Sequence, residues 1–178
     1  VDAAGLATTV SFAGDSRTAV ADFVWKWAPN GNARERNFKL QGEYFRRNED
    51  GRLSCAERDT SGACGGAAGL ADSYRSTQSG FYLQGVYQFM PRWRVGYRYD
   101  RLDSGTPSFG PTLVAGDLPQ LASWKPQRGT LMADYASSEF ARLRLQVARD
   151  TSRGAGQADT QVWLQYVMSL GAHGAHKF

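Results

Sequence analysis

Apolar residues alternate with other residues over several short stretches of the sequence. From Ala19 to Trp27 every second residue is apolar, and Asp22 and Lys26 lie between them. Because successive side chains of a β-strand point to opposite faces, this period of two predicts a strand and excludes an amphipathic helix. The same pattern predicts further strands over residues 6–12, 37–44, 81–89, 92–100, 130–135, 141–147 and 161–170. We therefore expect an all-β chain of about eight antiparallel strands.

The predicted connections alternate between short and long. The sequence predicts tight turns at 14–16, 29–33, 90–91 and 136–139, long loops at 48–72 and 104–127, and an intermediate one at 151–158. Apart from the turn at 14–16, the short turns fall on one side of the sheet and the longer loops on the other. This asymmetry is typical of up-and-down outer-membrane barrels, which also have an even number of strands. We expect residues 1–178 to form one transmembrane β-barrel domain, or the C-terminal part of a larger barrel.

Large aromatic residues cluster on the apolar faces near the predicted short turns. Trp25 and Trp27 precede one such turn, and Phe89 and Trp93 flank another. Aromatic belts of this kind mark the interfaces of membrane barrels. Small residues on the same faces would be acceptable against lipid but would leave a soluble core underfilled. A soluble ligand-carrying barrel, with its apolar face inward, remains an alternative.

Composition and charge narrow the classes further. The 178 residues contain 21 Lys and Arg against 17 Asp and Glu, and the net charge of +4 is too small to demand a nucleic-acid partner. The longest segment without these residues, 160–176, is interrupted by Gln, Gly and His, so no helix reaches the ~20 apolar residues that a membrane span requires. The sequence begins at Val1 without a basic and apolar leader, so an export signal has been removed or lies outside it.

The predicted polar faces carry more basic than acidic residues, which suggests a cationic lumen. The residues expected to line this ion pathway are Lys26, Lys39, Arg92, Arg94, Arg98, Arg142 and Arg144. Guanidinium groups match carboxylate and phosphate oxygens, so such a lumen would favour anions. In the alternative interpretation these groups pair with Asp22, Glu43, Asp100 and Asp134 and fill the lumen, because eight strands leave room for little more than side chains.

Other chemistry is sparse. Cys55 and Cys64 lie in one long loop on the outer side, where a disulfide is the expected state. His173 and His176 would point to opposite faces of a strand, so we expect no metal site and no cofactor. The predicted outer loops contain no histidine that could act as a base, so we expect no enzyme. Arg and aromatic residues of 92–99 occupy opposite faces, which argues against nucleic-acid binding.

The end of the chain carries a family resemblance. Apolar residues alternate from Val162 to Leu170, and in the same register the last residue, Phe178, falls on the apolar face. This segment resembles the terminal strand of Gram-negative outer-membrane proteins, in which a final Phe is the signal for the barrel-assembly machinery. A looser likeness to porin-like and receptor-type barrels is carried by residues 22–32 and 40–47.

The resemblance implies a location and partners. It places the chain in the bacterial outer membrane with a periplasmic C-terminus, in contact with outer-membrane lipids, lipopolysaccharide and the barrel-assembly machinery. Other barrel subunits or an accessory outer-membrane protein are further expected partners. The expected function is a porin-like channel or receptor for the passage of small, anionic solutes. The alternative is a small plugged barrel with a structural, adhesive or partner-binding role through its long outer loops.

Overall fold

The structure is a computed structural model, and it describes residues 10–56, 68–154 and 156–169. Cys64, His173, His176 and Phe178 lie outside these residues, so the predictions made for them remain predictions. No helix in the described part of the chain is both long and apolar enough to cross a membrane.

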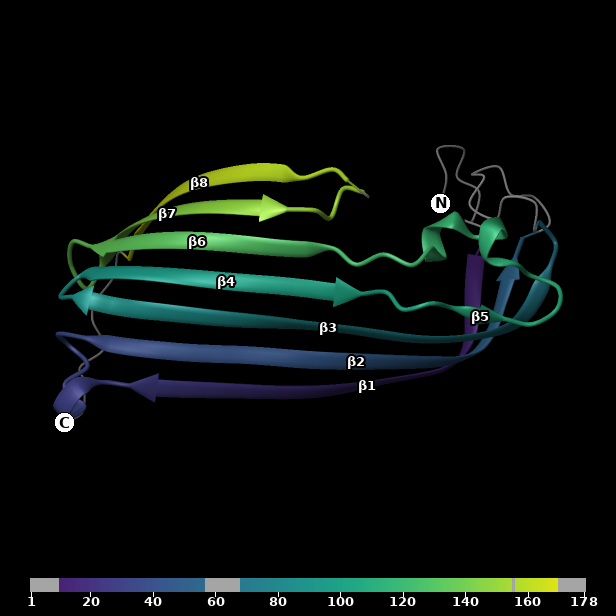
Figure 1. The fold of residues 1–178 in the computed structure, drawn as a ribbon, viewed down its shortest axis with the longest axis horizontal. Coiled ribbons are helices and arrows are strands. Elements are labelled where there is room, and N and C mark those ends of the chain that lie inside the picture. The colour runs from purple at the N-terminus through teal and green to yellow at the C-terminus, as the bar shows by residue number, and fades with distance from the viewer. Residues whose placement is uncertain (1–9, 57–67, 155, 170–178) are drawn as a thin grey trace. The chain divides into compact units, whose positions relative to one another are not determined.

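The described chain is all-β and antiparallel, as the alternation predicted (Figure 1). Its strands are β1 (Val10–Trp27), β2 (Asn37–Cys55), β3 (Ala71–Met90), β4 (Trp93–Asp103), β5 (Ser108–Phe109), β6 (Gln127–Ala136), β7 (Ala141–Asp150) and β8 (Asp159–Met168). They form a sheet in the order β1-β2-β3-β4-β6-β7-β8, and the short β5 pairs with β3. Among the described residues no pairing joins β1 to β8, so these strands are the two edges of an open sheet.

The first strand differs from the prediction. The expected turn at 14–16 is wrong, because residues 10–27 form one continuous strand. At Gly14, an added Cβ would lie 2.5 Å from the Cα of Gly51 in β2. The two glycines therefore permit a close approach of two backbones and make no turn. The eight described strands include the short β5, which the sequence did not predict, and do not include a separate strand over 6–12.

The short turns at the other strand ends agree with the prediction. Asn30 and Gly31 both have positive φ, 51° and 74°, as a tight turn with Asn-Gly at its centre requires. The β3–β4 turn is closed by Arg92, whose φ is 71°. The carbonyl of Arg92 accepts a hydrogen bond of 2.9 Å from the backbone N–H of Ala136, which ties the start of β4 to the end of β6.

The chain divides into two compact units, and the strands β1 to β4 contribute residues to both. Unit 1 comprises Val1–Ala21, Glu43–Phe81 and Arg101–Pro126. Unit 2 comprises Asp22–Gly42, Tyr82–Asp100 and Gln127–Phe178.

Unit 1 has a small apolar core. Leu53 and Cys55 of β2 and Tyr74 of β3 are buried there together with Leu113 and Leu118, which come from the long connection between β4 and β6. This connection contains the 3₁₀ turns η2 (Ala115–Asp117) and η3 (Pro119–Leu121). Because Leu118 is fully buried, the connection is packed onto the strands of unit 1.

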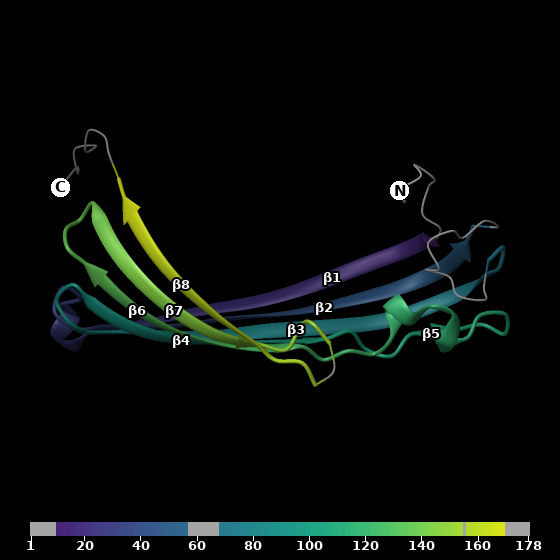
Figure 2. The ribbon, with the colours of Figure 1, turned by 90° about the horizontal axis from the view of Figure 1, so that it is seen from above.

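Unit 2 contains β6, β7 and β8, which lie side by side and curve together (Figure 2). Their register places apolar residues in rows across all three strands. The three rows are Leu131, Val147 and Val162, then Ala133, Leu145 and Leu164, then Tyr135, Leu143 and Tyr166. The intervening positions include a polar row of Asp134, Arg144 and Gln165, and mixed rows such as Met132, Gln146 and Trp163. A one-residue shift in pairing would break both sets, so the sequence pattern fixes this register.

Candidate functional site

The two faces of the sheet in unit 2 differ in an unusual way. On the apolar face, the side chains of Leu131 and Leu164 are 61% and 72% exposed. On the polar face, Gln88 and Asp134 are only 5% and 3% exposed. A water-soluble sheet buries its apolar face and exposes its polar one. In unit 2 the apolar rows of β6, β7 and β8 are exposed while Gln88, Thr130 and Asp134 of the opposite face are buried, although Lys26, Lys39 and Arg94 on that face are exposed.

Aromatic pairs lie on this apolar face near the short turns. The rings of Trp25 and Phe38 meet edge to face with centroids 5.9 Å apart, and those of Trp93 and Tyr135 are 4.8 Å apart. Trp25 and Trp93 are nevertheless exposed. The aromatic cluster expected beside the short turns is therefore present in unit 2.

Glycines on the apolar face are covered by neighbouring rings. A Cβ at Gly42 would lie 2.7 Å from a ring carbon of Phe23, and one at Gly85 would lie 3.3 Å from the ring of Phe38. At these two glycines, aromatic side chains from the adjacent strands occupy the space that a larger residue would fill.

Two of the predicted lumen arginines form ion pairs on the polar face. Arg144 makes a two-pronged contact with Asp134, with distances of 2.6 and 2.8 Å. Arg98 pairs with Asp100 at 2.6 Å and lies over the ring of Tyr82, 3.9 Å from its centroid. These two arginines follow the alternative in which basic and acidic residues satisfy one another.

The other predicted lumen residues have different surroundings. Arg94 donates a hydrogen bond of 3.2 Å to the side-chain oxygen of Gln88. The Nε atom of Arg142 is buried and has no hydrogen-bond partner among the described residues. Lys26 and Lys39 are exposed, and neither lines the hollow at the short-turn end of unit 2.

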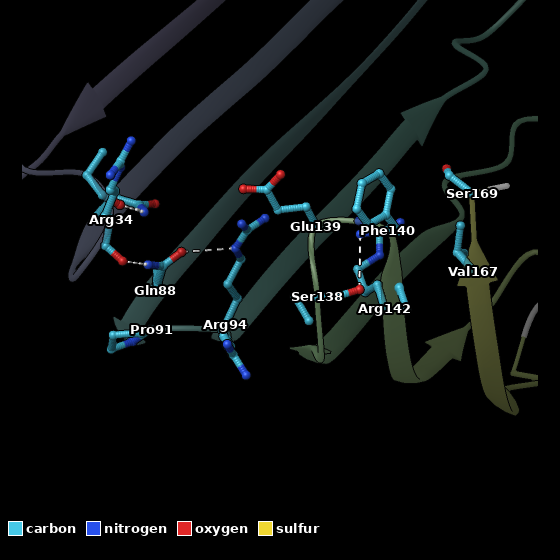
Figure 3. Close-up of a pocket in the computed structure, with 15 residues that line it drawn as sticks. Arg34, Gln88, Pro91, Arg94, Ser138, Glu139, Phe140, Arg142, Val167 and Ser169 are labelled. Atoms are coloured by element: carbon cyan, nitrogen blue, oxygen red, sulfur yellow. Dashed lines mark hydrogen bonds between the residues drawn. The ribbon is translucent and has the colours of Figure 1, made fainter. Parts of the chain in front are cut away.

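A hollow of about 770 Å³ lies at the short-turn end of unit 2 (Figure 3). Three predicted lumen residues, Arg92, Arg94 and Arg142, line it together with Arg34 and Glu139. In Figure 3 the side chain of Arg94 rises between Gln88 and Glu139. The structure thus collects four arginines and one glutamate around one space.

Gln88 holds one side of this hollow in place. Its amide nitrogen donates to the backbone carbonyl of Arg34 at 2.7 Å, while its oxygen accepts from Arg94. The buried amide therefore connects the segment before β2 with β3 and β4. Sequence reasoning missed Gln88, Arg34 and Glu139. Gln88 was placed on the polar face of its strand, but the pattern does not show which polar residue is buried.

A second polar cluster lies in unit 1, where Asp72 holds the long connection. Its carboxylate accepts hydrogen bonds from the backbone N–H groups of Thr112 at 2.6 Å, Leu113 at 2.9 Å and Ser73 at 2.7 Å. These donors, with that of Leu113 first, outweigh the effect of burial and lower the pKa of Asp72 below its usual value. The sequence did not indicate this role, since the loop was predicted to extend to Asp72.

The same connection is held at its beginning and end. Asp103 forms an ion pair of 2.8 Å with Lys125 and accepts a hydrogen bond from the backbone N–H of Gly105. The hydrogen bond from Lys125 is the main reason that the pKa of Asp103 is lowered. The connection between β4 and β6 is therefore a structured element that is fastened at several points.

The remaining predictions concern cysteines and metals. Cys55 is buried and disulfide-bonded, and the other cysteine of the chain is Cys64, which lies outside the described residues. The described ranges contain no cluster of three His, Cys, Asp or Glu side chains that could hold a metal ion.

Comparison with known proteins gives one similarity. An uncharacterized protein of Aquifex aeolicus (strain VF5) is 25% identical over 149 residues, which is 80% of this chain. The chain spans only 27% of the length of that protein. No family model matches the sequence, and no solved structure matches the fold.

Proposed function

We propose that this chain is a strand segment of an outer-membrane β-barrel, with a porin-like or receptor-type role in the passage of small anions. The observation that carries the proposal is that the apolar face of the unit 2 sheet is exposed while polar residues of its opposite face, Gln88, Thr130 and Asp134, are buried. Lipid is a solvent that favours such a surface, and barrel strands alternate apolar side chains outward with polar ones inward. In this proposal the C-terminus is periplasmic and the short turns lie on the periplasmic side.

Strand length is consistent with strands that cross a membrane. A transmembrane strand needs about 9–11 residues, and β6, β7 and β8 each have 10. β1, β2 and β3 have 18, 19 and 20 residues, which is about twice that need. We propose that β6, β7 and β8 cross the membrane and that β1, β2 and β3 are long enough to cross it and to extend beyond it.

The open sheet bears on the size of the barrel. Both edge strands present unpaired backbone groups, which cannot face hydrocarbon. In the proposal they pair with each other or with further strands, and the length of the Aquifex protein favours further strands. Lipids, lipopolysaccharide, the barrel-assembly machinery and neighbouring barrel subunits are then the proposed partners, and no catalytic role is assigned.

A specific observation also favours the second candidate, a plugged barrel. Alternation along β3 assigns the buried Tyr74 to the same set of positions as Gln88, which is the polar set. The connection between β4 and β6 packs against Tyr74 through Leu113 and Leu118. In a closed barrel this connection would lie inside the lumen and restrict passage.

Recording from planar lipid bilayers separates the two candidates. The channel role predicts discrete conductance steps and a reversal potential that favours anions. Lys39→Glu together with Arg94→Glu should reduce that anion preference. The control is Arg149→Glu, because alternation along β7 places Arg149 in the apolar set, with Leu143 and Leu145. A protein that inserts but stays silent would instead support the plugged barrel.

A further inference from the structure

The arginines at the short-turn end of unit 2 surround a space without an equal number of acidic groups. The hollow is lined by Arg34, Arg92, Arg94 and Arg142, and Glu139 is the acidic residue among its lining residues. Four cations around one carboxylate repel one another, and water weakens this repulsion at the exposed Arg34, Arg92 and Arg94 more than at the half-buried Arg142. An anion in the hollow would remove it.

Arg142 supplies the most specific indication. Its Nε atom is buried, and within the described residues it has no hydrogen-bond partner. A buried donor of a charged group is costly to leave unpaired. Its neighbour on the same face of β7, Arg144, is satisfied by Asp134. The difference between the two shows that Arg142 is not held by the ion-pair network of the sheet.

Arg94 is held in position for a ligand. Its Nε donates to Gln88, and Gln88 is itself fixed by the backbone carbonyls of Arg34 and Glu35, at 2.7 and 3.4 Å. A guanidinium bound through Nε keeps its terminal nitrogens as further donors. Figure 3 shows this side chain extending into the region between Gln88 and Glu139.

We propose that this hollow is a binding site for a small oxyanion, a carboxylate or a phosphate, held by Arg94 and Arg142 with Arg34 and Arg92 nearby. Guanidinium groups bind both kinds of oxyanion through paired N–H donors. Glu139 opposes the ligand and weakens its binding. The inference rests on the proposed function in so far as it names the solute that the barrel would pass or receive.

Isothermal titration calorimetry of the detergent-solubilised chain tests the site, since binding needs neither insertion nor conductance. Inorganic phosphate and succinate are titrated at low ionic strength, where screening is weak, with sodium chloride as the control for nonspecific charge. We expect saturable binding of at least one oxyanion, and tighter binding of phosphate or of succinate identifies the group that the site prefers.

Variants give the decisive comparison. Arg94→Gln with Arg142→Gln should weaken binding by about tenfold or more, as expected for loss of charged hydrogen bonds. Arg149→Gln, which removes a charge from β7 outside the hollow, should leave the affinity unchanged. Glu139→Gln should tighten binding, a gain that misfolding cannot imitate.

The proposal is overturned if neither oxyanion binds saturably, if Arg149→Gln weakens binding as much as the double variant, or if Glu139→Gln does not tighten it. A chain that binds oxyanions but never conducts would retain the site and contradict the channel. A chain that conducts but binds no oxyanion would retain the channel and contradict the site.

Discussion

The ion pair of Asp134 and Arg144 shows how single residues stabilise the polar face of unit 2. The two side chains are directly opposite in the β6–β7 register, and Asp134 is almost completely buried. A buried pair offsets the loss of hydration only while both partners are present. Removing one partner therefore costs more than the pair itself contributes.

We predict that Asp134→Asn lowers the free energy of unfolding by about 2 kcal/mol, because it leaves Arg144 partly buried without its counter-ion. Urea unfolding of the protein in lipid vesicles measures this change. Asp50→Asn is the matched control, since Asp50 and Arg75 are both exposed and an exposed pair contributes less than about 1 kcal/mol. Equal effects of the two substitutions would contradict the role assigned to burial.

Sequence alternation predicted the face of each of these residues but not its partner. Arg98, Arg142 and Arg144 share the polar face because of strand periodicity. Arg98 meets Asp100 of its own strand, whereas the partner of Arg144 depends on the β6–β7 register, which depends on contacts between segments distant in sequence. For this reason the pairing of Arg144 and the unpaired Nε of Arg142 could not be predicted.

At the scale of elements, the connection between β4 and β6 is organised by acidic residues at strand ends. Asp72, in the second position of β3, binds two consecutive backbone N–H groups of the connection. Two buried leucines of the connection then complete the core of unit 1. The prediction of a long loop was correct at 104–127, but its structure was not foreseen.

The lowered pKa of Asp72 gives the hydrogen bonds from the N–H groups of Thr112 and Leu113 to its carboxylate a definite pH dependence. The pKa of an aspartate side chain in an unfolded chain is about 3.9. In the folded state the pKa of Asp72 is lower than this usual value. The stabilisation by these hydrogen bonds is therefore complete above the unfolded-state pKa of about 3.9. It is lost as the pH falls through the lower, folded-state pKa. NMR spectra should show the amide signals of Thr112 and Leu113 shifting together, with a midpoint below 3.9.

Asp72→Asn should abolish that transition, because the amide side chain does not titrate in this range. The signal of Gly105, whose N–H is bound by Asp103, should still respond to acid and serves as the internal control. A midpoint above the ordinary carboxyl pKa, or a transition that persists in the variant, would contradict the role assigned to the Asp72 carboxylate.

Strand length was the element property that the sequence predicted least well. The expected third long strand began at Phe81, whereas β3 begins at Ala71. Residues 72–80 are mainly polar on both sets of positions, so they show no alternation. Alternation marks a strand only where apolar and polar residues alternate in the sequence, so a segment that is polar in both sets gives no such signal, even though Tyr74 within it packs into the apolar core of unit 1.

At the scale of the whole molecule, the proposed membrane location depends on whether the apolar rows of β6, β7 and β8 face lipid or water. The exposed apolar rows and the polar row of Asp134, Arg144 and Gln165 are both consequences of a period of two and a fixed register. The all-β, antiparallel class could therefore be predicted from sequence. Whether the sheet closes could not, because closure depends on how the edge strands β1 and β8 are paired.

The most direct test is a nitroxide accessibility scan along β7 in lipid vesicles, with single cysteines at positions 143, 145 and 147 and at 146 and 148. Cys55 is disulfide-bonded and does not compete for the label. The account predicts that labels at Leu143, Leu145 and Val147 are accessible to oxygen dissolved in lipid and shielded from a water-soluble nickel reagent. Labels at Gln146 and Ala148 should lack this oxygen accessibility. Labels at 143, 145 and 147 that are shielded from both reagents, as inside a soluble core, would contradict the membrane assignment.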